Sequence, residues 1–94
     1  MPIGLLTIHL QLPGVKSLKE KRSLIRPVLA RLHKEFNVSA AEMDRLDAWQ
    51  ESIIACSLVS NDSGYTQKAL QKVLEFTERN WPELPVLAYR IEII

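Results

Sequence analysis

The chain has 94 residues, of which 47% are hydrophobic and 24% are charged, and this is the composition of one ordinary globular domain, residues 1–94. Twelve Lys and Arg residues against eleven Asp and Glu residues give a formal net charge of +1, which excludes the strongly basic profile of a protein that coats DNA nonspecifically. Cys56 is the only cysteine, so an internal disulfide is excluded and a reducing compartment, the cytoplasm, is expected. No stretch is long and apolar enough to predict a membrane span.

Residues 3–12 are expected to form a β-strand, because apolar and more polar positions alternate along them. One face would carry four large apolar side chains, those of Leu6, Ile8, Leu10 and Leu12. The opposite face would carry Leu5, Thr7, His9 and Gln11. Pro13 and Gly14 end the strand.

Residues 17–36, SLKEKRSLIRPVLARLHKEF, predict the first helix. Ser17 followed by Glu20 fits a capping box, in which each side chain accepts a hydrogen bond from a free backbone N–H at the helix start. Apolar residues at spacings of three and four then make one stripe, comprising Leu18, Leu24, Ile25, Val28, Leu29, Leu32 and Phe36. Pro27 is expected nearly opposite the centre of this stripe, on the solvent side, where it would bend the helix.

Positive charge is concentrated in the first part of the chain. Residues 1–40 hold seven Lys and Arg against two acidic residues, whereas residues 41–94 hold five against nine. On a helical wheel Lys19, Arg22, Arg26 and His33 project within roughly 60° of one another. This flank predicts either an ordinary solvated helix surface or a basic patch for an anionic partner.

The remaining elements follow in the order strand, strand, helix, strand. Strands are expected over residues 38–44 and 51–60, a helix over residues 65–80, and a last strand over residues 86–94. Two helices with apolar stripes must cover one sheet, and right-handed crossovers leave few topologies. The sequence therefore predicts an α+β fold, a ferredoxin-like β-α-β-β-α-β sandwich with a four-stranded antiparallel sheet and both helices on one face.

No catalytic constellation is evident, and neither an enzyme nor a cofactor is expected. Glu42, Asp44 and Asp47 are spaced as oxygen ligands for Mg²⁺ could be, which leaves a metal-dependent enzyme as a remote alternative. A solvated acidic loop, with Glu42 and Asp44 on one exposed strand face, is the preferred interpretation, so no metal is expected. Cys56 lies in an apolar run and is expected to be a buried thiol rather than a nucleophile.

Three segments of the chain resemble the YlxP-like family of small bacterial proteins, a domain of unknown function. They are SLKEKRS (17–23), FNVSAAEMDRLDAWQ (36–50) and VSND (59–62), and they occur in the family's order and at similar spacing. The chain departs from the family at Pro27, where a residue that favours helix is more usual. The resemblance implies a ferredoxin-like fold. It also implies a role associated with RNA or the ribosome, because genes of the family often lie beside genes for translation initiation and ribosome maturation.

Ferredoxin-like sheets often bind RNA by stacking bases on aromatic residues of the central strands, but strands 3–12 and 51–60 carry none. RNA, ribosomal RNA in particular, would instead meet the basic flank and the loop before it through its phosphates. The candidate nucleic-acid-binding residues are Lys16, Lys19, Lys21, Arg22 and Arg26.

A protein-interaction or homodimerisation module is the rival hypothesis. The sheet face away from the helices is expected to carry an apolar patch, through which two copies could pair. Asp47, Trp49 and Gln50 are candidate interaction residues, although Trp49 could also plug the margin of the core.

Overall fold

The computed structural model describes residues 2–44 and 48–94. Its elements are β1 (Ile3–Gln11), α1 (Leu18–Glu35), β2 (Ser39–Asp44), β3 (Glu51–Val59), α2 (Ser63–Asn80) and β4 (Val86–Ile93). These match the predicted elements in order and type, with bounds that move by two residues at most. None of the helices in the described part is both long and apolar enough to cross a membrane.

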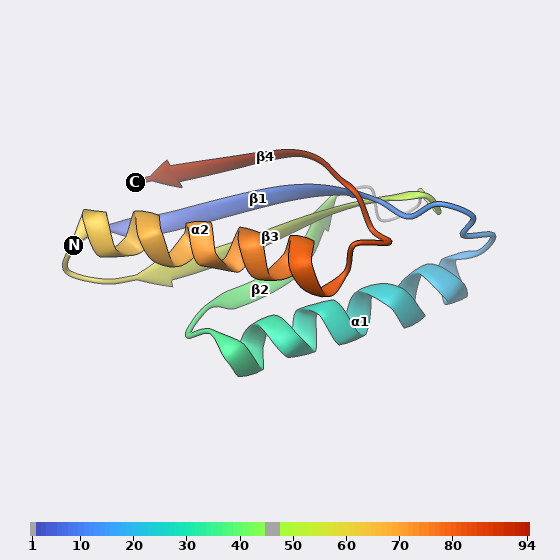
Figure 1. Ribbon diagram of the computed structural model, residues 1–94, viewed down its shortest axis with the longest axis horizontal. Coiled ribbons are helices and arrows are strands. Elements are labelled where there is room, and N and C mark those ends of the chain that lie inside the picture. Colours follow the sequence, from blue (N-terminus) through green and yellow to red (C-terminus); the bar gives the residue numbers. More distant parts are fainter. Residues whose placement is uncertain (1, 45–47) are drawn as a thin grey trace.

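The four strands form one antiparallel sheet in the order β2-β3-β1-β4, and α1 and α2 lie side by side on the same face of it (Figure 1). This is the ferredoxin-like arrangement that the sequence predicts. β2 and β4 are the edges, and the central strands β1 and β3 pair over nine residues each. The chain termini lie together at one end of the sheet, and α1 begins at the other (Figure 1).

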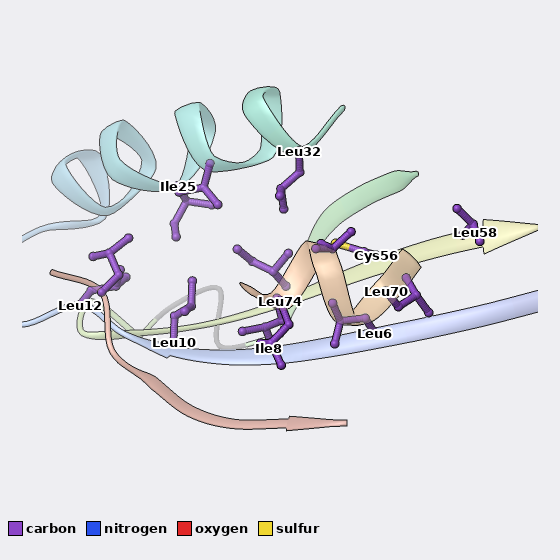
Figure 2. Packing of buried hydrophobic residues seen from close by; sticks show 14 of the residues in the cluster. Leu6, Ile8, Leu10, Leu12, Ile25, Leu32, Cys56, Leu58, Leu70 and Leu74 are labelled. Atoms are coloured by element: carbon purple, nitrogen blue, oxygen red, sulfur yellow. The ribbon is translucent and has the colours of Figure 1, made fainter. Parts of the chain in front are cut away.

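Alternation along β1 and β3 decides which side chains enter the core. Leu6, Ile8 and Leu10 of β1 and Ile54 and Cys56 of β3 are buried under the helices. The helices complete this core with Ile25, Val28 and Leu32 from α1 and Leu70, Val73 and Leu74 from α2 (Figure 2). Cys56 is thus the buried thiol that the sequence predicts, and burial raises its pKa to about 11.

Helix α1 begins at a cap that the sequence identifies in part. The Oγ of Ser17 accepts a hydrogen bond from the backbone N–H of Glu20 at 3.1 Å, as expected of a capping box. The Glu20 carboxylate accepts from the N–H of Lys16 at 3.2 Å instead of that of Ser17. Pro27 lies inside α1 on its exposed side, as predicted. Its ring and its missing N–H therefore affect the solvent side of the helix and not the side that packs on the sheet.

Candidate nucleic-acid interface

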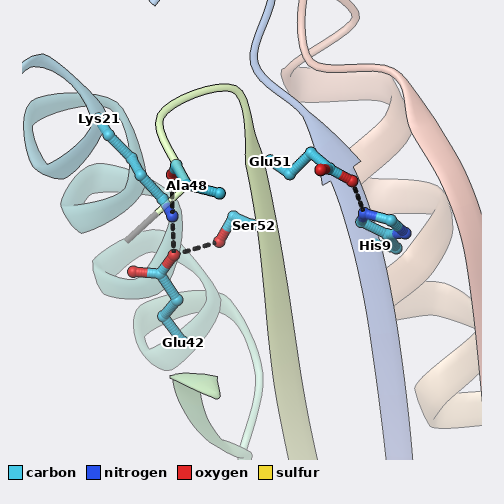
Figure 3. Close-up of polar contacts among 6 residues, drawn as sticks. All are labelled: His9, Lys21, Glu42, Ala48, Glu51 and Ser52. Carbon is cyan, nitrogen blue, oxygen red and sulfur yellow. Dashed lines mark hydrogen bonds and ion pairs between the residues drawn. The ribbon is translucent and has the colours of Figure 1, made fainter. Parts of the chain in front are cut away.

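The apolar stripe of α1 contains a lysine. Lys21, Ile25, Val28 and Leu32 are the buried residues of this helix, and Lys21 is only 1% exposed. Its Nζ lies 2.9 Å from Oε2 of Glu42 on β2 and donates a hydrogen bond of 2.7 Å to the carbonyl of Ala48. The hydroxyl of Ser52, at the start of β3, donates to the same Glu42 oxygen at 2.7 Å (Figure 3).

Lys21 therefore does not belong with the other candidate nucleic-acid-binding residues. Its ammonium is buried beneath α1 and neutralised by Glu42, so it cannot reach a phosphate from this position. The signal was present in the sequence, because residues 21, 25, 28 and 32 follow the i, i+4, i+7, i+11 spacing of a buried helix face. Leu24, in contrast, which the predicted stripe includes, is exposed.

The expectation for Glu42 was also wrong. Its carboxylate faces α1 rather than solvent, because Glu42 pairs in register with the buried Ile54 and so points to the helix-covered side of the sheet. A bulge between Glu42 and Asp44 breaks the alternation on which the prediction of one shared exposed face depended. The side chain of Asp44 and the whole of Asp47 lie outside the described residues, so the metal and interaction hypotheses for these two positions gain no structural information.

The other four candidates are exposed and form a basic row. We use this name for Lys16, which precedes α1, and for Lys19, Arg22 and Arg26 on its surface. None of their side chains lies within ion-pair distance of a carboxylate in residues 2–44 or 48–94. By contrast, Arg31 pairs with Glu35 and Arg90 with Glu92.

The neighbours of α1 show which way the basic row faces. His33 projects on the same flank as the row, and its Nε2 lies 3.2 Å from the carbonyl of Ala40 on the edge strand β2. Arg31 projects on the other flank, where its guanidinium lies 5.3 Å from the ring centre of Phe76 on α2. The row therefore lies on the side of α1 that is turned away from α2, along the outer margin of the molecule.

Trp49 lies in the segment that links β2 to β3, and half of its surface is exposed. The residues on either side of it are tied to the start of α1. Ala48 accepts the Lys21 hydrogen bond, and Gln50 accepts a 2.9 Å bond from the N–H of Leu12 and donates from Nε2 to the carbonyl of Val15 at 3.3 Å. Trp49 is not part of the buried core cluster, whereas Trp81 packs against that cluster beside Phe76.

The open face of the sheet carries an apolar patch, as expected, and register shows which residues form it. Ala55 of β3 lies between Thr7 of β1 and Ala41 of β2, so these three side chains point away from the helices. A hollow of about 280 Å³ lies over this region, lined on its apolar side by Leu5, Ala41, Met43 and Ala55. Next to it, His9 and Glu51 form an ion pair at 2.7 Å (Figure 3).

In the part of the chain that the structure describes, no three His, Cys, Asp or Glu side chains gather as a metal site would require. The features that remain are a ferredoxin-like α+β domain with a basic row on its first helix, a tethered exposed tryptophan and an open apolar sheet face. These features define a small α+β domain with the ferredoxin-like fold.

The chain belongs to the family described as "Protein of unknown function (DUF503)", whose model matches residues 3–91. It is 38% identical over 76 residues to the "Uncharacterized protein YlxP" of Bacillus subtilis (strain 168), a match that covers 81% of this chain and 82% of that protein. The resemblance seen in the sequence is thereby confirmed. Neither description names an activity or a partner.

Proposed function

We propose that this protein binds RNA through the basic row on α1, as an accessory factor associated with the ribosome. The observation that supports this proposal is the row itself: four exposed cations on one margin of the molecule, with no described carboxylate in ion-pair distance. Side chains in this state favour a polyanion, because binding releases the counterions that a phosphate backbone holds.

The geometry of the row suits contact with a backbone rather than with base edges. Lys19 and Arg26 are seven residues apart on one helix, which spaces their origins by about 10 Å along the helix axis. Lysine and arginine side chains on such a line reach successive phosphates without contacting the base edges, so they do not select an RNA sequence. Binding is therefore expected to follow the shape and charge of the RNA.

The composition of the central strands favours RNA binding on α1 over base stacking on the sheet. In ferredoxin-like proteins that bind RNA on the sheet, aromatic residues of the central strands stack with the bases. β1 and β3 hold no Phe, Tyr or Trp, and their outward positions are occupied by residues such as Thr7, His9 and Ala55. The choice of ribosomal RNA depends on the gene neighbourhood that the YlxP-like resemblance implies. The proposed location, the cytoplasm, depends on the single cysteine, which suits a reducing compartment.

Binding of a fluorescent single-stranded RNA to the protein, measured over a range of salt concentrations, tests the proposal. With four phosphate contacts, the logarithm of the binding constant should fall against the logarithm of salt concentration with a slope of about −3. The double variant Arg22→Gln/Arg26→Gln should reduce the slope to about −1.4. Lys68→Gln/Lys72→Gln, which removes two exposed charges from α2, is the matched control and should keep the wild-type slope. No binding at low salt, or equal loss in both double variants, would contradict the proposal.

Homodimerisation through the open sheet face is a second candidate function, favoured by the hollow around Ala55 and by Met43, which is 61% exposed. Ala55→Glu places a charge in the middle of this face without touching the core. If two copies pair there, sedimentation should show a dimer for the wild-type protein and a monomer for this variant. A wild-type protein that stays monomeric at high concentration would exclude this candidate.

A further inference from the structure

We infer that Trp49 is a stacking platform for an unpaired base, so that the RNA recognised by the basic row is single-stranded at this point. This inference depends on the proposed function, and it adds the class of RNA and the residue that selects it. Its starting point is the state of Trp49, which is 50% exposed although a side chain of this size could bury a large apolar area in the core.

The backbone on either side of Trp49 is held in place. Before it, the carbonyl of Ala48 accepts the 2.7 Å hydrogen bond from the buried ammonium of Lys21, which is itself paired with Glu42 (Figure 3). After it, Gln50 is bonded through its backbone carbonyl to Leu12 and through its side chain to Val15. An exposed aromatic on an ordered backbone loses little conformational entropy when a ligand stacks on it.

The same contacts place the backbone of Trp49 near the start of α1, where the basic row begins. Its two neighbours in sequence contact Val15 and Lys21, and the segment between those residues contains Lys16 and Lys19. Both lysines are exposed, at the end of the molecule where α1 begins (Figure 1). A chain with alternating bases and phosphates can therefore place a base on the indole while its neighbouring phosphates meet the lysines.

The space beside Trp49 is open enough for such a ligand. A hollow of about 370 Å³ lies against this segment, and Ala48, Trp49, Gln50 and Glu51 are among the described residues that line it. Two carboxylates of this end already have partners, because Glu51 pairs with His9 and Glu20 accepts the Lys16 N–H. No described carboxylate lies within ion-pair distance of the cations of the row, and this charge favours a nucleic acid over an apolar protein surface as the occupant.

The test uses a variant in which Trp49 is the only tryptophan, Trp81→Phe, since the chain holds two. Titration with a single-stranded RNA decamer should quench its fluorescence, and a duplex of the same length should leave it unchanged. In the full-length protein, Trp49→Ala should weaken decamer binding at least about tenfold and leave the salt slope unaltered, because the phosphate contacts remain. Trp49→Phe should restore most of the affinity.

Tyr65→Ala is the matched control, since Tyr65 is also an exposed aromatic and lies at the start of α2, away from the row. If the protein binds RNA with the expected salt slope but Trp49→Ala binds as well as the wild type, the inference is wrong and the proposed function stands. If no RNA binds at any salt concentration, both fail. If Trp49→Ala abolishes capture of a protein partner while RNA binding is unchanged, the residue is a protein contact and the inference is likewise overturned.

Discussion

Lys21 has a structural role that its charge alone would not indicate. Its ammonium lies beneath α1 and joins three parts of the chain: the helix, Glu42 of β2 and the carbonyl of Ala48 before β3. Removing one partner of such a buried pair leaves an uncompensated charge in a site with little water, whereas removing both need not destabilise the fold. The pair is thus a tether that fixes where β2 and the Trp49 segment lie against α1.

Single and double substitutions should distinguish the loss of one partner of the buried pair from the loss of both. Lys21→Met and Glu42→Leu are each expected to lower the free energy of unfolding by about 3 kcal/mol, and the combination Lys21→Met/Glu42→Leu by much less than their sum. Urea denaturation measures all three. Arg90→Met, which breaks an exposed pair with Glu92, is the control and should cost less than about 1 kcal/mol. Additive losses in the double variant would show that the two side chains act independently.

For single residues, the sequence predicts burial along the strands better than it predicts which side chains pair. The alternation along β1 correctly identifies its buried positions, because it depends only on the period of a strand. The apolar run around Cys56 correctly predicts a buried thiol. The partner of Lys21 lies 21 residues away in sequence, on a strand whose register against β3 places Glu42 opposite the buried Ile54. Because no local pattern reports that register, Glu42 was expected in solvent.

Helix α2 packs directly against the backbone of β1 at Gly4. A Cβ built on Gly4 would lie 2.3 Å from Cγ2 of Thr66 and 2.7 Å from Cδ1 of Leu70, both on α2. Only a residue without a side chain lets the first turn of α2 lie this near the strand. Thr66 is also held by its hydroxyl, which lies 2.6 Å from the hydroxyl of Ser60.

Gly4→Ala is therefore expected to destabilise the protein by about 1–3 kcal/mol, because the added methyl group must push α2 away from β1. Thermal or urea unfolding measures the change. Thr66→Ser removes Cγ2 but keeps the hydroxyl, so Gly4→Ala/Thr66→Ser should recover part of the loss. A Gly4→Ala variant as stable as the wild type would mean that α2 can shift without cost.

The elements themselves were predictable, and their close contacts were not. Ser17 and Asp62 each cap a helix by accepting a hydrogen bond from a backbone N–H three residues later, and the sequence signals the cap at Ser17. Gly4 lies in a strand pattern that would tolerate many residues, and only the approach of α2 explains why a glycine fits there. Proximity between elements depends on packing in three dimensions, which a local pattern does not contain.

At the scale of the whole molecule, the two ends of the sheet differ. The chain termini lie at one end, and α1 begins at the other (Figure 1). Lys16, Lys19 and the backbone of Trp49 lie near the start of α1. The order of elements was sufficient to predict the ferredoxin-like topology, because two crossovers over one sheet leave few arrangements. The closeness of the Trp49 backbone to the start of α1 was not predictable, since it depends on the Lys21 and Gln50 hydrogen bonds.

We propose that RNA binds along the margin of α1, and an NMR titration locates the bound surface directly. A single-stranded RNA decamer added to ¹⁵N-labelled protein at low salt should shift the backbone amides of residues 15–26 and 48–50. The amides around Lys68 on α2 and around Ala55 on the open sheet face should stay in place. Shifts confined to the open face or to α2, or no shifts at all, would contradict the proposal that RNA binds along α1.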